Sequence, residues 1–107
     1  MNRIVRRVIL LAFVSACSSW VAAQGDAVSL FKSKCALCHA EDGSGNSPTG
    51  KALKARDLRS EETQQRSDAE LTEVIAKGRN KMPAFRQKLK PEQIQQLVVY
   101  VRQLAKK

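Results

Sequence analysis

The run Cys35-Ala36-Leu37-Cys38-His39 constrains this chain more than any other feature. Two cysteines separated by two residues and followed at once by a histidine are the sequence form of covalent haem attachment. Each thiol can add to one vinyl group of the haem, and the spacing places both sulfurs along one edge of the macrocycle. The histidine then lies under the iron, where an imidazole nitrogen can bind it. The run therefore predicts one covalently bound haem c with its iron, attached through Cys35 and Cys38, with His39 as an axial iron ligand.

Three other interpretations of this run are weaker. A thioredoxin-like redox pair is typical of a βαβ pattern, which this sequence does not show. A structural zinc site takes about four ligands, and the sequence after residue 23 offers only the two cysteines and the single histidine. A structural disulfide between Cys35 and Cys38 would fit an exported protein, but it would leave His39 unexplained.

The N-terminus has the form of a targeting segment. A basic stretch over residues 1–7 precedes an apolar stretch over residues 8–14, and small residues follow up to Ala23. This order predicts a signal peptide over residues 1–23 and a mature domain over residues 24–107, exported and most simply periplasmic. The alternative is a lipoprotein-type leader that ends before Cys17, because Val14-Ser15-Ala16-Cys17 resembles a lipobox. A lipid on Cys17 would then tether the domain to the periplasmic side of the membrane.

The sequence after residue 23 reads as all-α. We expect a first helix capped by Asp26 and running to residue 35, a loop over 41–50, a short helix within 51–57, a helix over 68–77 and a last helix over 91–104. Ser67 and Glu70 form a capping box, Gly78 suits a helix C-terminus, and Pro91 suits a first helical turn. The last helix carries a broad apolar stripe, formed by Ile94, Leu97, Val98, Val101 and Leu104. So small a domain has a thin core, which favours a bound cofactor as part of the fold.

Met82 is the candidate for the second axial ligand. It is the only methionine after residue 23, and it lies in the polar loop Gly78-Arg79-Asn80-Lys81-Met82-Pro83. A thioether is a soft ligand that raises the reduction potential when it is paired with imidazole. The alternatives are that a lysine amine binds the iron and that Met82 fills a gap in the core.

Together these features resemble the class I cytochromes c of the small bacterial kind, over residues 27–104. The resemblance rests on the haem motif, on Met82-Pro83 about 40 residues later, and on a terminal helix. It implies three to five helices around one haem, with Ala27 and Phe31 packed against Tyr100 of the last helix. It also implies that the Pro48 carbonyl accepts a hydrogen bond from His39.

The same resemblance suggests further roles, each with a plain alternative. Asn80 would bond near the methionine sulfur, and Lys51 and Arg56 would meet the haem propionates. An ordinary turn residue is the alternative for Pro48 and Asn80. For Lys51 and Arg56 the better expectation is a solvated surface.

The proposed ligand set points to electron transfer. A haem whose two axial positions are both filled by protein has no open position for a substrate, so we expect an electron carrier that cycles between Fe(II) and Fe(III) and has no catalytic residues. One alternative is an electron-accepting haem subunit of a larger redox complex. Another is a haem peroxidase or gas-binding protein in which Met82 does not hold the iron.

Charge suggests the kind of partner. The mature chain has 16 basic and 10 acidic residues, a net charge of +6. No acidic residue occurs between Glu73 and Glu92, whereas six basic ones do: Lys77, Arg79, Lys81, Arg86, Lys88 and Lys90. This stretch borders the expected haem edge, so it predicts a docking face for acidic redox partners. Nucleic acid is disfavoured because aromatic stacking platforms are missing.

Overall fold

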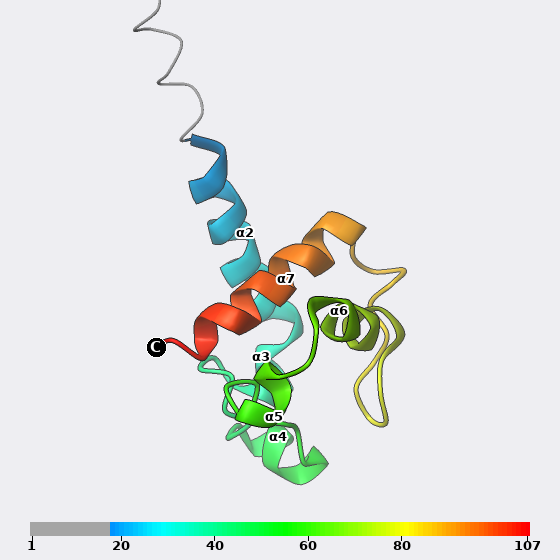
Figure 1. Ribbon diagram of the computed structural model, residues 1–107. Helices are drawn as coiled ribbons and strands as arrows, with labels where there is room; N and C mark the ends of the chain where they lie inside the picture. The colour runs from blue at the N-terminus through cyan, green and yellow to red at the C-terminus, as the bar shows by residue number, and fades with distance from the viewer. Residues whose placement is uncertain (1–17) are drawn as a thin grey trace, which may run out of the picture.

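A computed structural model describes residues 18–107, with side chains described from Gly25 onward. The predicted signal peptide or lipoprotein leader lies largely outside the described residues, and so does Cys17. The described chain is all-α, which confirms the predicted fold class, and Figure 1 shows how its helices are arranged. The helices are α2 (Ser18–Lys34), α3 (Ala36–His39), α4 (Pro48–Leu53), α5 (Glu61–Gln64), α6 (Asp68–Lys77) and α7 (Pro91–Leu104). No helix of this part of the chain is long and apolar enough to cross a membrane.

The helix boundaries follow from local capping chemistry. A serine precedes each of α4, α5 and α6, and its Oγ accepts the backbone N–H three residues later. Ser67 does so from Glu70 at 3.1 Å, as predicted, although the Glu70 carboxylate accepts from the Ser67 hydroxyl rather than from its backbone. Such a cap contributes about 1 kcal/mol of stability. Gly78 ends α6 with a φ of 75°, and Pro91 opens α7.

Two helix starts differ from the predictions, and one short helix is additional. The first helix begins at Ser18 rather than at Asp26, because Ala22, Ala23 and Gln24 favour helix and Gly25, the residue before the predicted cap, does not interrupt it. The predicted domain boundary after Ala23 therefore falls inside α2, and it stays a prediction. The short helix α4 begins at Pro48, three residues before the expected start, since Ser47 caps it. The helix α5 was not expected at all, and it brings the described helices to one more than the resemblance implied.

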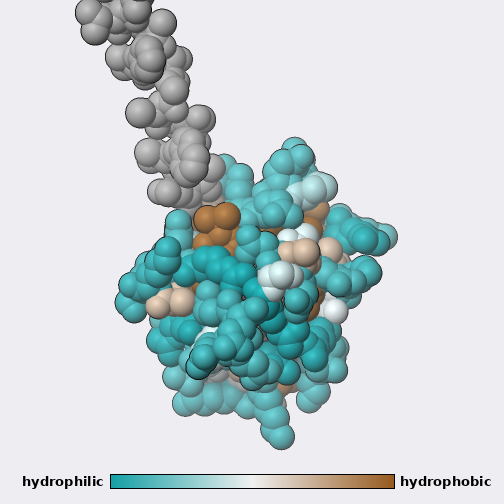
Figure 2. Space-filling model, viewed as in Figure 1, coloured by the Kyte–Doolittle hydropathy of each residue, from teal (hydrophilic) through white to brown (hydrophobic). Residues whose placement is uncertain are grey.

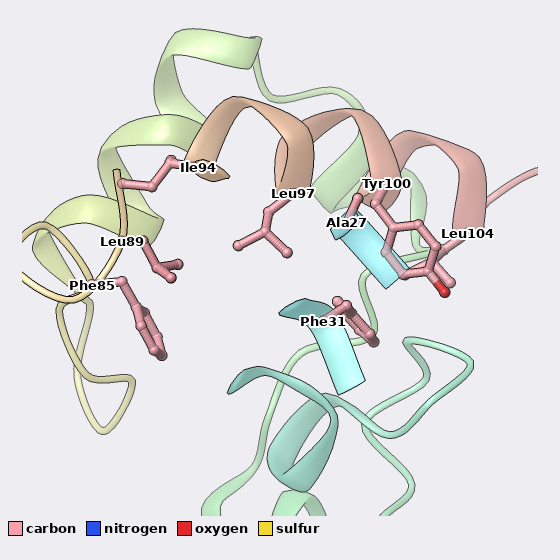
Figure 3. Packing of buried hydrophobic residues seen from close by; sticks show 8 residues of the cluster. All are labelled: Ala27, Phe31, Phe85, Leu89, Ile94, Leu97, Tyr100 and Leu104. Carbon is pink, nitrogen blue, oxygen red and sulfur yellow. The ribbon is translucent and has the colours of Figure 1, made fainter. Parts of the chain in front are cut away.

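The core forms where α2 crosses α7 (Figure 1). Ala27 and Phe31 of α2 pack against Tyr100 of α7, as the resemblance implied, and the two rings lie 5.0 Å apart at an angle of 57°. Figure 3 shows Phe85 and Leu89, from the loop before α7, on one side of Leu97 and Phe31 on the other, and all four residues belong to one buried cluster. A smaller cluster joins α6 to α7 through Leu71, Val98 and Val101. The predicted apolar stripe of α7 is buried along its whole length.

Candidate haem site

Helix α3 places the three residues of the predicted attachment motif on one side of the chain. Cys35 stands at the N-cap of α3, and the backbone N–H groups of Cys38 and His39 both donate to its carbonyl, at 3.2 and 2.9 Å. Spacings of three and four residues lie on one face of a helix, so both sulfurs and the imidazole project together. Leu37 falls on the opposite face and is 71% exposed.

Both cysteines of this motif are free and half-buried. Burial raises the pKa of the Cys35 thiol to about 11, and the neighbouring Cys38 adds to the shift. In the folded chain without a thioether bond, Cys35 would therefore remain a neutral thiol at neutral pH.

The His39 ring is held by the backbone carbonyl of Arg56, which lies 3.0 Å from Nδ1. Burial lowers the pKa of His39, so the ring is neutral at pH 7. A neutral imidazole that donates from Nδ1 carries its lone pair on Nε2, which is the atom a metal would take. The geometry thus presents Nε2 as a ligand.

The expectation that Pro48 supplies this acceptor is wrong. Pro48 is the first residue of α4, where a carbonyl is directed along the helix toward the N–H four residues later. Arg56 lies beyond α4, in a segment that returns past the motif, where the Leu58 N–H donates to the Gly43 carbonyl at 2.7 Å. A backbone carbonyl has no side-chain signature, so the sequence offered no signal for Arg56 in this role.

The loop after the motif is tied closely to α3. The Gly45 N–H donates to the His39 carbonyl at 2.7 Å, and the Ser47 hydroxyl donates to the Leu37 carbonyl at 2.6 Å. Gly50, in the first turn of α4, approaches the motif so closely that a Cβ there would overlap the Cys38 carbonyl oxygen. Gly45 has a φ of 78°, as the predicted turn requires.

Met82 sits in a tight turn after α6. Its backbone exchanges two hydrogen bonds with Arg79, at 2.9 and 3.2 Å, and Asn80 occupies the left-handed region of this turn with a φ of 55°. The turn is attached to the end of α6, because the Phe85 N–H donates to the Ile75 carbonyl at 3.0 Å. Asn80 is exposed, which fits its role as a turn residue.

Met82 and the attachment motif meet at the core. The Met82 side chain is half-buried and packs against the same buried cluster that Cys35 contacts. This cluster contains Phe31, Phe85 and Leu97. The fold thus brings Cys35 and Met82, from two distant segments, to the border of one apolar cluster.

The donor set suits a haem. Two thiols at attachment spacing, a neutral imidazole and a half-buried thioether are the groups that a covalently bound haem takes from a protein. Within the described residues, no three His, Cys, Asp or Glu side chains gather as a metal site. The Arg56 guanidinium forms an exposed ion pair with Glu62, and Lys51 is exposed, as the surface interpretation expected.

We call the segment 78–83, which carries Met82, the thioether loop. An all-helical fold built around the attachment motif and this loop defines a small haem-binding electron-transfer protein. Sequence similarity to known proteins supports this class. Residues 22–101 match the family described as "Cytochrome C oxidase, cbb3-type, subunit III". The chain is 33% identical to cytochrome c6 of Nostoc sp. (strain PCC 7120 / SAG 25.82 / UTEX 2576) over 94 residues, which cover 88% of this chain and 82% of that protein. It is 38% identical to cytochrome c6 of Anabaena variabilis over 72 residues, which cover 67% and 80%.

A solved structure gives the same result. The KustC0563 c-type cytochrome is 34% identical and superposes with a TM-score of 0.68 over 74% of this chain and 96% of its own. The chain therefore belongs to the class I c-type cytochromes. It carries one covalently bound haem c with its iron, and it acts as an electron carrier between redox proteins rather than as an enzyme.

Proposed function

We propose that Cys35 and Cys38 carry the haem through two thioether bonds, and that His39 and Met82 are the axial ligands of its iron. The observation that carries this proposal is the hydrogen bond from His39 Nδ1 to the Arg56 carbonyl, which leaves Nε2 free. When bound, the haem supplies a metal that cycles between Fe(II) and Fe(III). The chain supplies the ligands, their orientation and the apolar surroundings.

The residues around the ligands have separate tasks. The Arg56 carbonyl fixes the tautomer and the orientation of the imidazole, and it raises the basicity of Nε2. The two hydrogen bonds between Arg79 and Met82 close the thioether loop, and the bond from the Phe85 N–H to the Ile75 carbonyl holds it against α6. A soft sulfur ligand favours Fe(II) over Fe(III), so we expect a higher reduction potential than two imidazoles would give. With His39 and Met82 both bound to the iron, no coordination position would remain for a substrate.

A basic surface beside Met82 suits acidic redox partners. We call Lys77, Arg79, Lys81, Arg86, Lys88 and Lys90 the basic loop surface; all six are exposed. Lys77 pairs with Glu73 at 2.7 Å, whereas the other five form no ion pair with any described residue. The four ion-paired arginines of the described chain (Arg56, Arg59, Arg66 and Arg102) contact carboxylates of residues 42–70. Five unpaired basic side chains thus lie in the segment that carries Met82, where their positive charge would speed encounter with an acidic partner.

We place the mature carrier in the periplasm. The supporting observations are the basic, apolar and small-residue stretches of residues 1–23. Figure 2 shows a mostly hydrophilic surface on one face of the molecule, which suits a protein that diffuses in water. A lipid on Cys17 would instead keep the domain at the membrane, and intact mass distinguishes the two forms.

A second candidate function is supported by the family that the chain matches, whose description names a subunit of an oxidase. In this case the chain would be an electron-accepting haem subunit of a larger complex. Gel filtration of a native extract separates the candidates, because a free carrier elutes at the size of a small monomer and a subunit elutes with its complex.

The ligand set is tested by optical spectroscopy of Met82→Ala. The wild-type ferric protein should show the weak charge-transfer band from methionine to iron, and its ferrous form should not bind carbon monoxide. Met82→Ala should lose the band and bind carbon monoxide, because one axial position opens. Pro83→Ala, which changes the neighbouring residue and keeps the thioether, is the matched control. A wild-type protein without the band contradicts the ligand assignment.

A further inference from the structure

Ser47 takes part in two hydrogen bonds that join α4 to the haem-attachment turn. Its Oγ accepts the Gly50 N–H at 3.0 Å, which caps α4, and donates to the Leu37 carbonyl at 2.6 Å. The Cys38 carbonyl oxygen lies 3.1 Å from the same Oγ. A hydroxyl has one proton to donate, so the nearer Leu37 carbonyl is its main acceptor.

The other two capping serines lack this second contact. The Ser60 Oγ accepts the Thr63 N–H at 3.3 Å and donates to the Thr63 hydroxyl at 3.2 Å. The Ser67 Oγ accepts the Glu70 N–H at 3.1 Å and donates to the Glu70 carboxylate at 3.2 Å. Both keep their proton within their own helical turn, so the donation to α3 is not a consequence of capping.

The chain packs around this contact with little room to shift. Gly50 lies against the Cys38 carbonyl, and a Cβ on Gly50 would also approach the Ser47 Oγ to 2.8 Å. The Gly45 N–H binds the His39 carbonyl on the same turn. The carbonyls of Leu37 and His39 are thus each held by a donor from the loop that follows the motif.

We infer that Ser47 is a positioning residue for the proximal haem ligand: its hydroxyl holds the Leu37 carbonyl, fixes α3 and weakens the negative field of the α3 carbonyls at the iron. This inference rests on the proposed ligation by His39.

The direction of the electrostatic effect follows from charge. Carbonyl oxygens at the end of a helix carry partial negative charge, which favours the more positive Fe(III) over Fe(II). A hydrogen bond donated to one of these carbonyl oxygens, as by the Ser47 hydroxyl, reduces its negative potential and so weakens the preference for Fe(III). Loss of the Ser47 hydroxyl therefore lowers the reduction potential, and it also loosens the turn that carries His39.

The test compares holoprotein variants of two capping serines. Ser47→Ala and Ser67→Ala each remove one cap and should lose similar stability, but only Ser47→Ala should lower the reduction potential. Ser47→Thr keeps a hydroxyl and should restore the wild-type value. Ser47→Gly loses the hydroxyl but keeps a residue that caps nearly as well, so it tests the same point if Ser47→Ala folds poorly.

A second measurement is the proton NMR spectrum of the ferric protein. The haem methyl resonances should move in Ser47→Ala and Ser47→Gly, and stay in place in Ser67→Ala. If both Ser47 variants keep the wild-type potential and resonances, Ser47 only caps α4 and the inference is overturned. A wild-type protein without the charge-transfer band instead overturns the proposed ligation, and this inference with it.

Discussion

The ring of His39 is hydrogen-bonded to the backbone of Arg56: Nδ1 of the imidazole lies 3.0 Å from the Arg56 carbonyl oxygen. The acceptor does not depend on the Arg56 side chain, which points to an exposed ion pair with Glu62. The orientation of the proximal ring is therefore built into the path of the chain after α4.

Arg56→Ala tests this separation of backbone and side chain. It should leave the optical spectrum and the reduction potential of the holoprotein nearly unchanged, because the carbonyl remains. It should cost less than about 1 kcal/mol in the free energy of unfolding, since exposed ion pairs contribute little. Spectroscopy and denaturant titration measure both, and a large change in the potential would show that the side chain itself acts on the haem.

Phe31→Ala should be among the most destabilising changes in the chain. Phe31 is 1% exposed and packs on Tyr100, where α2 crosses α7. Removing a buried aromatic ring costs about 3–5 kcal/mol, which is a large part of the stability of a small domain. Val99→Ala, at a position that is 56% exposed, is the control and should change stability by less than about 0.5 kcal/mol. Equal effects in urea titration would contradict the packing described for this crossing.

Gly50→Ala should disturb the haem site, whereas Gly25→Ala should not. A Cβ at Gly50 would overlap the Cys38 carbonyl, while one at Gly25 would meet nothing within 4 Å. We expect Gly50→Ala to cost about 1–3 kcal/mol through overpacking and to change the haem spectrum. Gly25→Ala should be neutral or stabilise by up to about 1 kcal/mol, because alanine favours helix. A Gly50→Ala protein with wild-type stability and spectrum would refute the close approach of α4 to the motif.

Charge reversal on the basic loop surface should slow electron transfer to negatively charged surfaces. Lys81→Glu combined with Arg86→Glu should lower the transfer rate at a carboxylate-terminated electrode at low ionic strength. The difference should shrink at high salt, where the Debye length falls to about 3 Å at 1 M. Lys106→Glu with Lys107→Glu makes the same change in net charge at the C-terminus and should have a smaller effect. Equal slowing by both pairs would mean that net charge, and not this surface, governs docking.

The features that could be predicted from the sequence are mainly those whose sequence signal lies within one helical turn of the feature itself. The starts of α6 and α7 were predicted because the Ser67 cap and Pro91 act within one turn of their own positions. The packing of Phe31 on Tyr100 came from the family resemblance. The helix α5 was missed, since the four residues of Glu61–Gln64 are too few to show a period.

In the candidate site, too, the residues with a local sequence signal were predicted, and the contacts that depend on the fold were not. Cys35, Cys38 and His39 could be predicted from their spacing and residue type. The helix α3 places them on one face. The acceptor for His39 was wrongly assigned to Pro48, because a carbonyl carries no sequence mark and its partner depends on the fold. The donation from Ser47 to Leu37 was also beyond prediction, since it joins two elements whose closeness depends on Gly50.

Intact mass of the purified protein, taken after extraction with acidified organic solvent, tests the central claim most directly. If Cys35 and Cys38 hold the haem by thioether bonds, the chain keeps the mass of one haem and the red colour stays with the protein. Cleavage at the predicted site would also leave Gln24 at the N-terminus. A chain with the bare polypeptide mass, and pigment in the organic phase, would contradict the account.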